Sequence, residues 1–128
     1  MPHLSIRIDF EPTGSALGPG MAQLLERVAE LGSIRRAAMS MGMSYRKAWL
    51  LIQEIQKTFD GAVVTAEVGG VSGGGTRLTE LGDNLLKIYR RVESRAADST
   101  RADLDTLAAM VRASAGPRRV GRLKKKKR

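Results

Sequence analysis

Four consecutive residues in the first half of the chain place a hydroxyl, a phenol and two cations at the start of an expected helix. They are Ser44, Tyr45, Arg46 and Lys47. Arginine and lysine can donate hydrogen bonds to guanine O6 and N7 or neutralise a phosphate, and tyrosine can donate to a phosphate or pack on a thymine methyl. This run favours nucleic-acid binding, but a charged stretch on a helix is also typical of a solvated face. Both interpretations stay open for Arg46 and Lys47.

Further cations and glycines extend this constellation. Arg35 and Arg36 come early in the preceding helix, where a helix-turn-helix crosses the DNA backbone. Arg77 follows a glycine-rich run and is placed for a phosphate or minor-groove contact. The residues predicted to bind DNA are Ser44, Tyr45, Arg46, Lys47, Leu50, Arg35, Arg36, Arg77, Gly73, Gly74 and Gly75.

No comparable group of residues in the sequence points to catalysis or to metal binding. Cysteine is absent, and His3 stands alone near the N-terminus, so a metal site is not expected. The glycine-rich loop lacks the Gly-Lys-Ser/Thr ending of a P-loop and is flanked by two expected strands. No Ser/His/Asp set or carboxylate pair stands out. The sequence therefore predicts neither an enzyme nor a bound cofactor.

Trp49, the only tryptophan, borders the apolar side of the same helix. Two interpretations are open for it. Either its ring is partly buried, against the first predicted helix or against a β-hairpin (the wing) that follows this helix, or its indole N–H reaches the DNA backbone.

The elements that must position these residues follow from hydrophobic periodicity. Alternation over 4–10 predicts a half-buried strand, and the prolines and glycines of 11–20 interrupt it. Apolar residues at three- and four-residue spacing predict helices over 21–31, 33–41 and 44–59. Gly32 and Gly42 would end the first two, and Ser33 and Ser44 would cap the second and third.

The pattern changes after Gly61. Two short strand-like segments, 62–68 and 76–79, surround the glycine-rich loop and predict a β-hairpin, or wing. Thr79 would cap a last helix, whose propensity persists with interruptions until Gly116 and Pro117. Its surplus apolar positions suggest a dimer seam.

We therefore expect a mostly α fold with a small β-hairpin, a winged helix-turn-helix with a long C-terminal helix. The predicted organisation is an N-terminal strand and loop over 1–17, a DNA-binding domain over 18–95, a helical continuation for dimerisation over 96–116 and a disordered basic tail over 117–128.

The formal net charge of +9 is distributed unevenly. Eight cations and no acid follow Pro117, so subtracting them leaves the first 116 residues at +1. The tail can attract phosphates, but geometry for reading a sequence must come from the nearly neutral domain. No signal peptide or membrane span is evident, and we expect a cytoplasmic, nucleoid-associated protein without a membrane partner.

Two motifs resemble the N-terminal domain of the ModE family of molybdate-responsive regulators and, more distantly, the winged helix of LysR-type regulators. One is Ser-Tyr-x-x-Ala-Trp from Ser44; the other is Gly-Gly-Gly-x-x-Leu-Thr-x-x-Gly from Gly73. The resemblance covers roughly residues 18–95. It implies a homodimer that binds a palindromic operator in double-stranded DNA and a link to molybdenum metabolism. It also implies that 44–47 begin the recognition helix and that Gly73, Gly74, Gly75 and Arg77 belong to the wing.

Full-length members of that family carry a C-terminal oxyanion-binding domain, whereas this sequence ends after its basic tail. We therefore expect no direct molybdate sensing by this chain. It would be a constitutive regulator, or a subunit that receives its signal from a separate effector-sensing protein.

Two other classes of function remain open. A general nucleoid or RNA-binding protein would rely on the tail, although aromatic residues make up only 4% of the chain, few for stacking on single strands. A protein-interaction module would use the same fold without binding DNA.

Overall fold

The computed structural model describes residues 2–67 and 75–111, which fall into two compact units. The described residues between Ser5 and Ser94 form the larger unit, and the described residues before and after them form the smaller one. The basic tail therefore lies outside the described residues, as do Gly116 and Pro117. No helix within the described ranges has both the length and the apolar character to cross a membrane.

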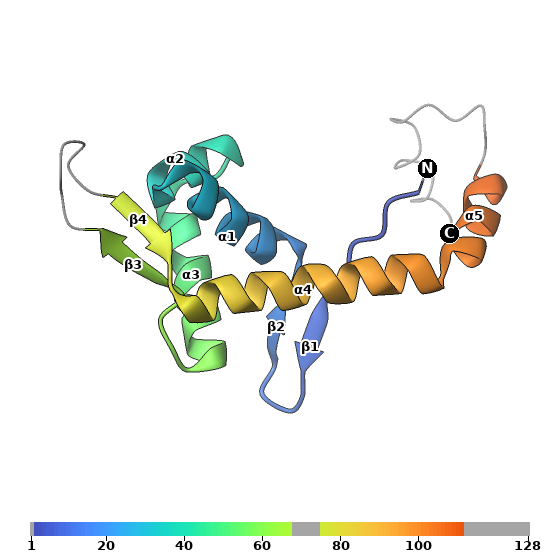
Figure 1. The fold of residues 1–128 in the computed structure, drawn as a ribbon, viewed down its shortest axis with the longest axis horizontal. Coiled ribbons are helices and arrows are strands. Elements are labelled where there is room, and N and C mark those ends of the chain that lie inside the picture. Colours follow the sequence, from blue (N-terminus) through green and yellow to red (C-terminus); the bar gives the residue numbers. More distant parts are fainter. Residues whose placement is uncertain (1, 68–74, 112–128) are drawn as a thin grey trace, which may run out of the picture. The chain divides into compact units, whose positions relative to one another are not determined.

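The described elements give a mostly α winged helix, which confirms the predicted fold class (Figure 1). The helices are α1 (Pro19–Leu31), α2 (Ile34–Ser40), α3 (Tyr45–Phe59), α4 (Glu80–Ser99) and α5 (Arg101–Met110). The strands β1 (Ile8–Phe10) and β2 (Ser15–Leu17) form one antiparallel hairpin. The strands β3 (Val64–Glu67) and β4 (Gly75–Leu78) form the second, which is the wing.

Local signals set the limits of the first three helices as expected. Gly32 ends α1 in the left-handed conformation, with φ of 67°, and its N–H donates to the carbonyl of Val28. The hydroxyl of Ser33 accepts from the N–H of Arg36 and caps α2. Ser44 caps α3 in the same way, through the N–H of Lys47. Each cap satisfies a helix donor that would otherwise have no partner in the helix.

The main core lies among α1, α2, α3 and the base of the wing (Figure 1). Leu24 and Val28 of α1 and Ile52 of α3 are completely buried in it. Val63, just before β3, is equally buried and joins the wing to the helices. The orientation of α3 therefore depends on the same packing that holds the wing.

A second, smaller cluster corrects the prediction for the N-terminus. Residues 11–20 were expected to interrupt the chain, but β2 forms within them and pairs with β1. The alternation of 4–10 is real, since Ile6, Ile8 and Phe10 pack around buried Leu17 and Tyr89. Only Ile8–Phe10 forms strand, because β2 offers partners to those three residues alone.

The wing is joined to the helices by close backbone contacts. The N–H of Thr79 donates to the carbonyl of Val63, and its hydroxyl donates to the carbonyl of Ala62 while capping α4 through the N–H of Gly82. On the other side, the N–H of Thr76 donates to the carbonyl of Gly32. The start of α4 and the end of α1 thus hold the wing in place.

The long C-terminal helix of the prediction is interrupted. α4 ends at Ser99 and α5 begins at Arg101, and the backbone of Thr100 between them departs from helical geometry, with φ of −114° and ψ of 13°. Within its described range α5 buries no residue, and it ends at Met110.

Candidate nucleic-acid interface

One face of α3 is turned to the core and the opposite face to solvent. Ala48, Ile52 and Ile55 are buried. At 100° per residue, the positions opposite them share one exposed line along the helix. That line consists of Arg46, Leu50, Gln53 and Lys57. Leu50 lies near its centre and is 52% exposed, so an apolar side chain stands among polar ones where a base edge or a thymine methyl would be met.

Two residues predicted separately are in contact at the start of α3. The guanidinium of Arg35 in α2 lies 4.9 Å from the ring centroid of Tyr45, a cation–π distance. This contact links the exposed surfaces of the two helices. Ser44 lies beside it, and its oxygen is engaged in capping α3.

Trp49 marks the flank of α3 that is turned to the wing. It lines a shallow, mainly apolar cleft of about 370 Å³ together with Val64, Ala66 and Thr76 of the wing strands. Its ring is 41% exposed. This supports partial burial against the wing, the first of the two interpretations, and leaves the other edge open to solvent.

The wing has a cation at its base. Arg77 lies opposite Thr65 in the hairpin, and its Nη1 is 3.6 Å from Oε2 of Glu67. Both side chains are more than half exposed, so this ion pair contributes little to stability. Gly73 and Gly74 lie outside the described residues.

The packing of the wing against α1 requires a glycine at position 75, which the sequence alone does not reveal. A Cβ at this position would lie 2.6 Å from the carbonyl oxygen of Gly32. Thr76 donates its N–H to the same oxygen, so β4 approaches the end of α1 too closely for any side chain. The glycine therefore sets the position of the wing, whether or not it touches DNA.

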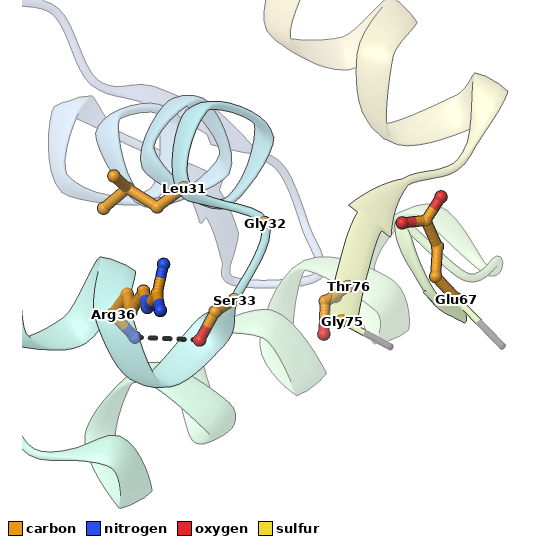
Figure 2. A pocket seen from close by; sticks show the side chains of 7 residues that line it. All are labelled: Leu31, Gly32, Ser33, Arg36, Glu67, Gly75 and Thr76. Atoms are coloured by element: carbon orange, nitrogen blue, oxygen red, sulfur yellow. Dashed lines mark hydrogen bonds between the residues drawn. The ribbon is translucent and has the colours of Figure 1, made fainter. Parts of the chain in front are cut away.

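Arg36 lies beside the wing. It borders a cleft of about 480 Å³ between the turn joining α1 to α2 and the end of the wing strands where Glu67 pairs with Gly75. Figure 2 shows Arg36 on one side of this cleft, Glu67 on the other and Thr76 between them. The cation and the wing thus frame one concave surface.

The middle of α4 is tied to α1 by an ion pair. Arg90 donates to Glu26 of α1 at 2.8 Å and to Glu93 at 2.9 Å. Burial lowers the pKa of Arg90, but the two carboxylates outweigh this and raise the pKa above its usual value, so the cation persists. Burial raises the pKa of Tyr89, whose hydroxyl stays protonated at neutral pH and donates to the carbonyl of Ile6.

Among the residues predicted to bind DNA, the structure brings Arg35 and Tyr45 into contact and places Arg36 and Gly75 on one cleft beside the wing. Gln53 and Lys57 share the exposed line of α3 but were not predicted to contact DNA; their spacing from Arg46 and Leu50 was the available signal. Within the described residues, no three His, Asp or Glu side chains gather as metal ligands would.

Comparison with known proteins finds several relatives. The chain is 42% identical over 72 residues to the molybdenum transport protein ModE of Herbaspirillum seropedicae, covering 56% of this chain and 27% of that protein. It is 38% identical over 88 residues to the molybdenum-pterin-binding protein MopB of Rhodobacter capsulatus, covering 69% and 33%. It is 34% identical over 83 residues to the DNA-binding transcriptional dual regulator ModE of Escherichia coli K12, covering 62% and 32%.

No family model matches the chain. The matches span about a third of the length of these relatives. They agree with the two sequence motifs and with the winged fold on which those motifs lie. The chain therefore contains a winged helix-turn-helix domain that is similar in sequence to part of the ModE proteins.

Proposed function

We propose that this chain is a sequence-specific DNA-binding transcriptional regulator linked to molybdenum metabolism, not an enzyme. α3 would enter the major groove of double-stranded DNA, and residues 18–95 would form the binding domain. The chain would act in the cytoplasm, at the nucleoid, as a homodimer on a palindromic operator.

The observation that carries this proposal is the exposed line of α3. Arg46, Leu50 and Gln53 offer cationic, apolar and amide groups within two turns of one helix, the mixture that reads base edges. Arg35 lies over Tyr45 at the start of this helix, and the exposed Arg77 belongs to the wing; both cations would bind phosphates. The names of the relatives support the regulatory role and the link to molybdenum.

Exposed apolar residues support dimerisation. Ile88 and Val92 of α4 are 50% and 41% exposed, one helical turn apart. Two such faces brought together would remove them from water. An operator composed of two half-sites would then match the two-fold symmetry of the protein.

Genome-wide mapping of DNA bound by the full chain tests the proposal. Fragments recovered near genes for molybdate uptake or molybdoenzymes should bind the purified protein roughly a thousandfold or more tightly than random duplex does. Equal affinity for recovered and random fragments would overturn the claim of specificity.

A general nucleic-acid-binding protein is the second candidate, favoured only by the eight cations after Pro117. Titrations of the full chain and of a chain ending at Gly116 over a series of salt concentrations separate the two. Under our proposal, removing the tail flattens the salt dependence and weakens all duplexes about equally, while the preference for operator survives. Loss of that preference with the tail would favour the second candidate.

Ser44 allows capping to be separated from DNA contact. Ser44→Ala should destabilise the protein by about 1 kcal/mol, because the N–H of Lys47 loses its partner. Ser44→Asp should keep the cap and the stability, since a carboxylate is favoured at a helix N-terminus. It should nevertheless weaken operator binding, because it brings a negative charge to the phosphates.

Thermal unfolding and fluorescence titration measure these two effects. Ser33→Asp is the matched control, as Ser33 caps α2 by the same type of hydrogen bond. Unchanged operator affinity in Ser44→Asp would show that the start of α3 does not face DNA.

A further inference from the structure

The N-terminal hairpin reaches the flank of α3 that is turned away from the wing. Lys47 and Leu51 stand on that flank, about a quarter turn or more from the line through Leu50. They border a cleft of about 340 Å³ together with Met21 and Met43, at the start of α1 and before α3. Arg7, the residue before β1, closes the cleft from the other side.

The charge of this cleft is one-sided. Arg7 and Lys47 are its two charged lining residues, and none of the described residues that line it is acidic. Its floor is apolar, so the charge of the cleft comes from Arg7 and Lys47, and these two cations favour an anionic partner. Arg7 does have an acidic neighbour, since its Nε lies 2.9 Å from Oδ1 of Asp9, but both side chains are more than half exposed. Such a pair exchanges readily for another anion.

The dimensions of the DNA major groove indicate that the anion bound by this cleft is a backbone phosphate. A helix in that groove, which is about 12 Å wide, lies between the sugar-phosphate backbones of both strands. One backbone would pass the flank of Trp49 and the wing. The other would pass the opposite flank, where Lys47 and Arg7 stand. The flank away from the wing thus presents one cation from α3 itself and one from the start of the N-terminal hairpin.

We propose that Arg7 and Lys47 form a phosphate-binding cleft. With this cleft, the N-terminal hairpin binds the backbone of the second DNA strand. This inference rests on the proposed function. It assigns to β1 and β2 a binding role in addition to packing against Tyr89. The contact would add affinity without reading bases, because phosphates are the same in every sequence.

Replacement of Arg7 tests the proposal in the full chain. Arg7→Ala should weaken binding to operator and random duplex alike, by roughly eightfold at 0.1 M salt, with the difference disappearing near 1 M. The slope of log affinity against log salt should fall by about 0.9. Asp9→Asn should act in the opposite direction and raise affinity, because it frees Arg7 from its acidic neighbour.

Lys87→Ala is the matched control. Lys87 is also 67% exposed and also pairs with an acid, Asp83 at 3.0 Å, but it lies on α4 and lines none of the clefts beside α3. It should leave the salt slope unchanged. Circular dichroism of each variant verifies the fold.

The outcomes separate this inference from the function on which it rests. A wild-type salt slope in Arg7→Ala, with operator preference intact, overturns the phosphate cleft alone. An equal loss in Lys87→Ala overturns it as well, since the effect would then come from net charge. If the wild-type chain shows no preference for operator, the proposed function itself fails.

Discussion

Gly82→Ala is expected to lower the free energy of unfolding by about 2–3 kcal/mol. This loss of stability is the opposite of the usual effect of the substitution, because alanine is normally favoured over glycine inside a helix such as α4 by about 1 kcal/mol. Here a Cβ would overlap the carbonyl oxygen of Val63. That oxygen already accepts the N–H of Thr79, so the methyl group has to push the wing away from α4 and break this hydrogen bond.

Thermal unfolding followed by circular dichroism measures the effect as a decrease of roughly 10–20 °C in the midpoint. Gly20→Ala is the matched control, since Gly20 also lies in a helix but a Cβ there meets no atom within 4 Å. It should leave stability unchanged or raise it by about 0.5–1 kcal/mol. Equal behaviour of the two variants would contradict the close approach of α4 to the wing.

Residues that act on their near neighbours were predictable from sequence. Ser33 and Ser44 cap helices, and Gly32 ends one, through groups no more than four residues away. The exposed face of α3 followed from periodicity, because the spacing of Ala48, Ile52 and Ile55 fixes which side is buried. These signals were sufficient for the winged helix and for most of the candidate interface.

Contacts between distant segments were not predictable in this way. β2 was missed because three residues between two prolines show no alternation of their own and form a strand only through pairing with β1. Gly75 was predicted as part of a flexible wing, yet its own position depends on the carbonyl of Gly32. The cation–π contact of Arg35 with Tyr45 and the approach of Arg7 to the cleft beside Lys47 likewise depend on tertiary packing.

The two hairpins have similar roles in the candidate interface. Each hairpin packs against the helices by its base, through Val63 for the wing and Leu17 for the N-terminal pair. Each also carries or adjoins an arginine: Arg77 lies in the wing, and Arg7, just before β1, lines the cleft beside α3. If α3 reads bases between them, stability and phosphate contacts come from the hairpins while specificity comes from one exposed helical line.

Arg46→Ala is expected to reduce operator affinity by roughly 10- to 100-fold and to relax the preference at one base pair, without unfolding the protein. Arg46 lies in the first turn of α3, on the exposed line, so its removal leaves the buried face intact. Because recognition helices meet base edges with their N-terminal turns, Arg46 is closest to the expected readout position. Loss of a bidentate contact should then affect operator far more than random duplex.

Lys57→Ala tests whether position along the helix matters. Lys57 shares the exposed line with Arg46 but lies eleven residues further on, a rise of about 16 Å along α3. At that distance from the first turn it should contact phosphate or solvent, so its loss should weaken all duplexes slightly and equally. Titrations against operators altered one base pair at a time measure both variants. Equal losses on operator and random duplex in Arg46→Ala would mean that Arg46 contacts phosphate. If the protein keeps its function in the cell after Arg46 and Lys47 are both replaced by alanine, a protein-interaction module that binds no DNA would be favoured instead.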